Sequence, residues 1–295
     1  PIINARIPLA RKYTGVIEYH TSPNMSIFNA AGLGGGSLVF GATYVQPERS
    51  VFNRVFPAEV DVDDMENIYF PRVQQEVQFS HIPDDIYQSL YYQYARTFYD
   101  QVSRAGKPLR RLPASYDWDI IRREMNGEIP LEFLKGDGNY GTRNGSKYSL
   151  DKTYIARAEA TGKTRVMTLT NVVNISRSSD QKYLVQAERL SETGQVLERL
   201  TIQADRLFLC AGAPNTVKLL LKAKLTSNLT ALNDRIGKGF GTNGKTFFRR
   251  TVPEATGPLT GWTPAAASPH YTNPHVPIMI ENIPQPIGLI LPVPD

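Results

Sequence analysis

Apolar residues spaced four apart predict a helix over residues 84–105. They form one face of that helix, as expected for a helix that packs one side against a core. The members of this face are Ile86, Leu90, Tyr94, Phe98 and Val102. Asp84 or Asp85 can cap the start of the helix, and Gly106 supplies a stop signal at its end.

A different pattern follows between residues 165 and 202. Three strand-like runs succeed one another, at Arg165–Ile175, Tyr183–Leu190 and Gln195–Ile202. Short polar segments that favour turns separate them, at residues 178–180 and 191–194. The pattern predicts a β-meander.

A fourth strand-like run, Arg206–Cys210, leads into Ala211, Gly212, Ala213 and Pro214. A helix is expected to begin there, because proline suits the first turn of a helix. A strand, a tight glycine turn and a helix together bring backbone N–H groups up to a ligand. The same order is also common in α/β proteins generally, so ordinary packing is the alternative interpretation.

The remaining segments lack long periodic patterns. Residues 1–60 are rich in glycine and small residues with short β-like runs, residues 106–150 predict irregular connections, and proline and glycine are dense from residue 252 onward. No internal repeat interrupts this order. Helical and strand patterns together predict an α/β or α+β fold.

Composition and charge exclude some classes of function. The chain has 295 residues, 41% of them hydrophobic, which is enough for a sizeable core without disulfides. The net charge of +5 comes from scattered basic residues, so nucleic acid is not an expected partner. No apolar stretch reaches the roughly 18 residues of a membrane helix. The four histidines show no metal-ligand spacing, and Cys210, in an apolar run, is expected to be buried.

Glycine is concentrated in the segment from Gly32 to Ser37, which reads Gly-Leu-Gly-Gly-Gly-Ser. Such a run indicates either a turn with positive φ or a backbone that passes close to a ligand. It matches neither the dinucleotide fingerprint, since Ser37 stands where the third glycine would be, nor a phosphate-binding loop with its lysine. A flexible turn and a cofactor-contacting loop both stay open.

Glu281 is the single carboxylate in the apolar, strand-like run from Pro277 to Ile283. Apolar neighbours disfavour the charged form of a carboxylate, and a group tuned in this way can act as a proton-transfer base. The alternative is that strand alternation turns Glu281 to solvent.

Taken in order, these segments resemble the glucose–methanol–choline (GMC) oxidoreductase family, in particular its cholesterol oxidases. The similar stretches run collinearly through almost the whole chain. They comprise residues 25–28, Gly32–Gly41, 47–52, 69–72, Gly145–Tyr154, 161–163, Ala211–Ala213, 241–244 and Glu281–Leu289.

The resemblance implies FAD as cofactor, held covalently or not. One domain would bind FAD and a mainly β domain would roof the substrate. On that basis residues 1–80 would belong to the FAD-binding domain, 81–150 to an insertion on the substrate side, 151–250 to the FAD-binding domain again, and 251–295 to the start of the substrate-binding sheet. The residues implied to lie along the cofactor are Gly34, Gly35, Gly36, Ser37, Phe40, Gly41, Val172, Ala211 and Gly212.

The implied reaction is oxidation of an alcohol, a sterol or another bulky apolar alcohol, with electrons passed to oxygen or another acceptor. Glu281 would serve as the catalytic base that shifts a double bond. Peripheral contact with a membrane and a secreted or periplasmic location both stay open.

The chain departs from the family pattern in three ways. The family usually has Asn where Phe40 stands, which puts ordinary flavin reactivity or steroid specificity in doubt. The ADP-binding fingerprint would precede Pro1, and the catalytic His and Asn would follow Asp295. We therefore expect a piece of the family fold that does not turn over alone. A non-catalytic relic and a binding module for an apolar ligand are the alternatives.

Overall fold

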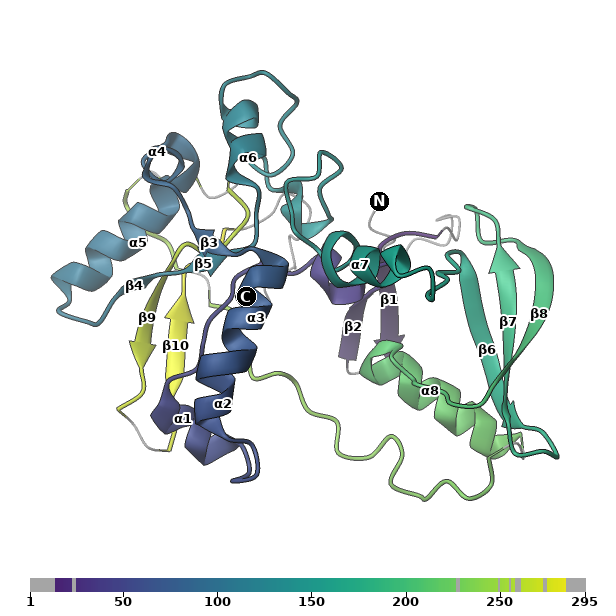
Figure 1. Cartoon of the computed structure of the whole chain (residues 1–295). Coiled ribbons are helices and arrows are strands. Elements are labelled where there is room, and N and C mark those ends of the chain that lie inside the picture. The colour runs from purple at the N-terminus through teal and green to yellow at the C-terminus, as the bar shows by residue number, and fades with distance from the viewer. Residues whose placement is uncertain are drawn as a thin grey trace. The chain divides into compact units, whose positions relative to one another are not determined.

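The computed structural model of the chain describes residues 14–22, 25–226, 229–248, 250–254, 256–257, 261–272 and 275–284. These residues form two compact units, which are described separately (Figure 1). The first holds residues 14–29 and Val166–Thr251, and the second holds Ala30–Arg165 and the described residues from Val252 onward. Both contain helices and strands, so the expected mixed α/β or α+β class is confirmed.

The first unit contains the meander that the sequence predicts. Strand β7 is central and pairs antiparallel with both of its neighbours, while α8 packs against β6 (Figure 1). Ile175, Val185 and Ala223 form the small core between helix and sheet. The elements of this unit are β1 (Ile17–Ser22), β2 (Met25–Ala30), β6 (Thr170–Arg177), β7 (Tyr183–Leu190), β8 (Val196–Ala204) and α8 (Gly212–Leu225).

The prediction of a fourth strand over Arg206–Cys210 is wrong. Leu207 and Leu209 pack against the core of this unit, but the segment has no hydrogen-bonded strand partner among the described residues. Alternate side chains therefore turn outward, and Phe208 is 83% exposed. Cys210 is exposed for the same reason, which contradicts its expected burial.

The second unit contains most of the helices and the larger core. Aromatic side chains dominate that core, among them Tyr92, Tyr116, Phe133 and Trp262. A three-stranded antiparallel sheet has the order β10-β9-β4 (Figure 1). The elements are α1 (Arg49–Val55), α2 (Val62–Asp64), α3 (Phe70–Val77), β3 (Ser80–His81), α4 (Asp84–Tyr87), α5 (Gln93–Arg104), β4 (Arg110–Arg111), β5 (Pro113–Ala114), α6 (Trp118–Met125), α7 (Ala156–Ala160), β9 (Ala266–His270) and β10 (Ile278–Glu281).

The single helix predicted over residues 84–105 is interrupted. Ser89 is extended between α4 and a 3₁₀ turn, and its hydroxyl donates to the carbonyl of Ile86 at 2.6 Å. Arg96 donates to the carbonyls of Tyr87 and Ser89. Side-chain hydrogen bonds thus replace the helical ones at this point. Pro83 rather than an aspartate is the N-terminal cap residue of α4, whereas α5 ends just before Gly106, as expected.

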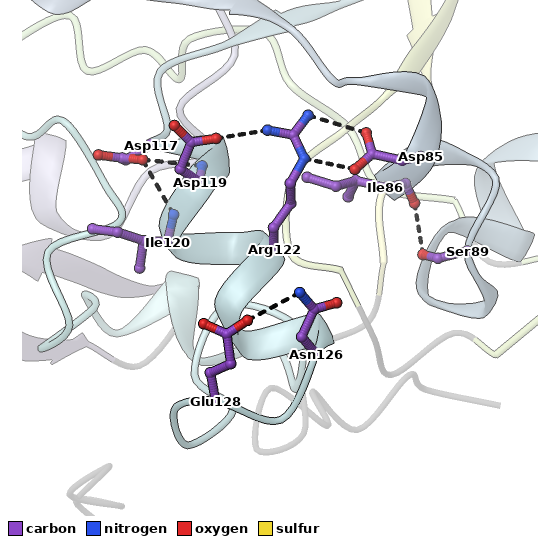
Figure 2. Close-up of polar contacts among 9 residues, drawn as sticks. All are labelled: Asp85, Ile86, Ser89, Asp117, Asp119, Ile120, Arg122, Asn126 and Glu128. Atoms are coloured by element: carbon purple, nitrogen blue, oxygen red, sulfur yellow. Dashed lines mark hydrogen bonds and ion pairs between the residues drawn. The ribbon is translucent and has the colours of Figure 1, made fainter.

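Residues 106–150 are more ordered than the sequence suggests, because they include α6. The carboxylate of Asp117 accepts from the backbone N–H groups of Asp119 and Ile120, which caps this helix (Figure 2). On the exposed side, Arg122 forms a two-pronged ion pair with Asp85 at 2.6 and 3.1 Å (Figure 2). This pair ties α6 to α4.

Glu124, on the opposite face of α6, is 1% exposed and organises the loop that follows the helix. Its carboxylate accepts from the backbone N–H groups of residues 132, 133 and 134, at 3.0–3.1 Å, and from the Asn144 amide at 2.6 Å. A buried carboxylate with four donors is fully hydrogen-bonded, so it can hold an irregular loop in one conformation.

We therefore expect Glu124→Gln to destabilise the protein. The amide that replaces one carboxylate oxygen would face N–H donors, so at least one buried donor loses its acceptor. The free energy of unfolding should fall by about 2 kcal/mol or more. Urea titration measures it, with exposed Glu128→Gln as the matched control. Equal stability of the two variants would contradict the role of Glu124.

Candidate functional site

The glycine segment forms a tight turn in the second unit. Gly34 has φ +105° and precedes a 3₁₀ turn over Gly35–Leu38. The Ser37 hydroxyl donates to the carbonyl of Gly34 at 2.7 Å and accepts from the backbone N–H of Leu150 at 2.9 Å. The segment is therefore an ordered turn and not a loose linker.

The glycines in this segment are required for different reasons. At Gly34 the positive φ disfavours any side chain, and an added Cβ would lie 3.2 Å from Asp151. At Gly41 a Cβ would lie 3.2 Å from the Pro264 ring. At Gly36 an added Cβ would meet no atom of the described residues within 4 Å, and φ is not positive. The fold thus accounts for glycine at positions 34 and 41, whereas neither packing nor φ accounts for it at position 36.

Buried Lys147 holds the end of this segment. Its ammonium donates to the carbonyls of Leu38 and Gly138, both at 3.0 Å, and to that of Phe40. It also lies 5.1 Å from the centre of the Phe40 ring. Three donors thus meet three carbonyl acceptors. Burial, together with the smaller effect of the nearby charge of Lys152, lowers the pKa of Lys147 to about 7.

A second anchor comes from the segment that leads into β9. The Thr263 hydroxyl donates to the carbonyl of Gly41 at 2.6 Å. Buried Tyr94 of α5 donates to the carbonyls of Gly261 and Thr263, at 2.7 and 2.9 Å. Burial raises the pKa of Tyr94, so its hydroxyl stays a donor. Helix α5 therefore fixes the segment on which the glycine turn rests.

Glu281 is attached to the same segment. It ends β10, directly opposite Ala267 of β9, and is half-buried. Buried Asn282 accepts from the backbone N–H groups of Ala265 and Ala266, at 3.2 and 2.7 Å, which pins the end of β10. The structure thus brings the glycine turn and the strand of Glu281 into one hydrogen-bonded network.

Strand alternation does not turn Glu281 fully to solvent. Ile278 and Ile280, on the opposite face of β10, are 46% and 47% exposed, while Met279 shares the half-buried face with Glu281. The apolar side chains are therefore the more exposed ones. Glu281 therefore lies on the half-buried face of the sheet and stays partly accessible there.

The other three residues of the expected site lie in the first unit. Val172 is 40% exposed on β6, next to a bulge in the ladder. Ala211 precedes α8, and Gly212 begins it with φ +75° and no atom within 4 Å of an added Cβ. Their cofactor role stays a prediction.

Lys147, Thr263 and Asn282 organise this region, yet the sequence patterns did not single them out. Nothing local distinguishes Lys147 from exposed Lys152, because its acceptors come from segments far away in the chain. Within the described part of the chain, no three His, Cys, Asp or Glu residues are grouped to hold a metal ion. Among the same residues, no helix has the length and apolar character that crossing a bilayer requires.

The buried ammonium predicts a pH dependence of stability. Below about pH 7 Lys147 is charged in both the folded and the unfolded chain, so folding carries the full cost of burying that charge. Between pH 7 and 10.5 the folded protein has released the proton while the unfolded chain keeps it, so stability rises with pH. Relative to Lys147→Met, the unfolding free energy should rise by up to about 1.4 kcal/mol per pH unit.

Urea unfolding of both proteins at several pH values between about 6 and 9, on either side of the folded pKa, measures this difference. Exposed Lys163→Met is the matched control and should follow the unaltered protein at every pH. Parallel stability curves for Lys147→Met and the unaltered protein would contradict the prediction.

Comparison with known proteins identifies relatives of this chain. Cholesterol oxidases from two strains of Mycobacterium tuberculosis, CDC 1551 / Oshkosh and ATCC 25618 / H37Rv, are each 26% identical over 239 residues. The match covers 76% of this chain and 40% of each relative, so the chain spans well under half the length of these curated relatives. The family model of the GMC oxidoreductases matches residues 13–242. The chain belongs to the GMC oxidoreductase family.

Proposed function

We propose that this protein uses FAD to oxidise an alcohol, and that the substrate is a bulky one. Membership of the GMC oxidoreductases supports an oxidoreductase function. The similarity to proteins named cholesterol oxidases supports a sterol or another bulky apolar alcohol. When bound, FAD supplies the acceptor for the hydride that leaves the carbinol carbon.

The observation that carries the proposal is Gly36. Neither its φ nor its packing against the described residues requires glycine at this position. A group from outside the chain that lies against the backbone would require it, because a side chain would hold that group away. The open space at Gly36 therefore fits a flat cofactor, whereas Gly34, Gly35 with its φ of +54°, and Gly41 serve the fold.

The chain's own residues keep this surface in place. Ser37 and Lys147 hold the carbonyl side of the turn, and Thr263 holds its end through the Gly41 carbonyl. Because these partners are themselves fixed, the exposed side of the turn is pre-organised and need not be ordered by the cofactor. Phe40, whose ring packs edge-on against Tyr44 with centroids 5.9 Å apart, fixes the side-chain surface next to it.

Glu281 is the proposed proton carrier. After oxidation produces a ketone, the carboxylate removes a proton from the carbon next to the carbonyl and returns it further along the chain of carbons, which moves a double bond. Its half-buried place at the end of a pinned strand suits this role, because a base must be held within reach of the carbon.

The cofactor role of Gly36 can be tested with Gly36→Ala and Gly36→Val. The Cβ that both side chains share meets no described atom within 4 Å, so the stability of the cofactor-free protein should change little. FAD affinity should fall in the order of side-chain size, by about tenfold or more for valine. Titration of cofactor-free protein with FAD measures it. Normal FAD affinity in both variants would mean that the turn does not contact the cofactor.

The role of Glu281 predicts a separation of two activities. Glu281→Gln keeps the shape but removes the base, so isomerisation of the ketone should fall by roughly 10²–10⁴-fold. Alcohol oxidation should fall far less, since that step does not use this carboxylate. Both rates can be followed on the purified full-length protein with a steroid alcohol and the corresponding ketone. Glu128→Gln should alter neither, and an unchanged isomerisation rate in Glu281→Gln would refute the assignment.

A further inference from the structure

The face of the sheet that carries Glu281 also carries an arginine. Arg110 of β4 pairs with Ala267 of β9, and Ala267 pairs with Glu281 of β10. Residues directly opposite one another in antiparallel strands point to the same face. Arg110, Ala267 and Glu281 therefore form one row, and the small side chain in the middle leaves room for the arginine to lie across the sheet.

The Arg110 guanidinium does reach across. Its Nη2 donates to the sulfur of Met279 at 3.2 Å, and Met279 is on β10, two residues before Glu281. Tyr271, just after β9, directs its hydroxyl to the same sulfur at 3.6 Å. Two donors thus converge on one point, about 7 Å along the strand from the position of Glu281.

These donors are poorly matched by their acceptor. A thioether sulfur is a weak acceptor, whereas a guanidinium carries five N–H donors suited to a carboxylate. Among the described residues no carboxylate lies within 4 Å of Arg110, and its buried Nε has no hydrogen-bond partner there. The adjacent Arg111 is different, since it forms an ion pair with Asp84 at 2.6 Å on the other face of the sheet.

We propose that Arg110 and Tyr271 form a subsite for a carboxylate of the substrate. The ligand's carboxylate would take the place of the sulfur as acceptor for both donors. The proposal rests on the proposed function, because it makes the substrate an alcohol that also carries a carboxylate, bound about 7 Å along β10 from the position of Glu281. Among bulky alcohols it favours one with a carboxylate over an uncharged sterol.

A pair of probes that differ only in charge tests the subsite. 4-(Hydroxymethyl)benzoate carries an alcohol and a carboxylate at opposite ends of one ring, and its methyl ester lacks the charge. Calorimetric titration of the protein, with FAD and without it, measures binding of both, with cholesterol as a third ligand. The acid should bind at least about tenfold more tightly than the ester, as a charge-assisted hydrogen bond implies.

Substitutions test whether Arg110 causes the preference for the acid. Arg110→Met should remove the preference for the acid and leave ester binding nearly unchanged. Arg110→Lys keeps the positive charge but cannot donate two parallel hydrogen bonds, so it should bind the acid with intermediate affinity. Arg111→Met, on the opposite face, is the matched control and should keep the preference. Should Arg110→Met fail to fold, the comparison of acid with ester on the unaltered protein still tests whether a carboxylate subsite exists.

The outcomes separate the subsite from the proposed function. Equal affinity for acid and ester, tighter binding of the ester or of cholesterol, or no saturable binding of the acid would each overturn the subsite. If FAD is bound and alcohols are oxidised without preference for the acid, the proposed function stands alone. If the acid binds through Arg110 but neither FAD binding nor oxidation occurs, the subsite stands and the proposed function fails.

Discussion

The irregular backbone of the second unit depends on the buried amino group of Lys147. Irregular backbone exposes carbonyl groups that helices and sheets would otherwise satisfy, and each must find a donor once it is buried. Lys147 supplies three donors to carbonyls at positions 38, 40 and 138, which come from two separate segments. A protonated lysine matches these acceptors one for one, whereas the neutral amine has only two N–H groups. The conformation of the glycine turn is thus coupled to a charge that burial makes costly, which also explains why the pKa of Lys147 is low.

Sequence patterns predicted the regular parts of the fold because those parts follow from local periodicity. β7, β8 and the start of α8 lie within two residues of their expected positions, whereas β6 begins at Thr170, five residues after the expected start. The break at Ser89 was missed because it depends on Arg96, a residue from the next helix that takes the carbonyls of residues 87 and 89. The segment before Cys210 alternates like a strand, but a strand also needs a neighbour, and periodicity carries no information about neighbours.

The candidate site also has parts that the sequence predicted and parts that it did not. The glycine content of residues 32–41 and the apolar run around Glu281 predicted the two segments of the candidate site in the second unit. The resemblance to the GMC family placed both segments at one site. The contacts that join these segments could not be predicted from the sequence, because Thr263 acts through one hydrogen bond and Asn282 through two, all to backbone atoms. Nor could sequence distinguish Gly36 from Gly34, since only the surrounding atoms reveal which glycine the fold itself requires.

Arg110 changes the character of the sheet face on which Glu281 lies. A roof for an uncharged sterol needs apolar side chains, and the apolar isoleucines of β10 are on the other face. The face of Glu281 instead combines a carboxylate, a guanidinium and a hydroxyl around one methionine. A partly buried cation without a carboxylate within 4 Å among the described residues costs free energy unless a ligand compensates it. At a substrate-binding site this unfavourable free energy is offset when the ligand binds. The placement of Arg110 beside the proposed base therefore fits selection among alcohols better than stabilisation of the fold.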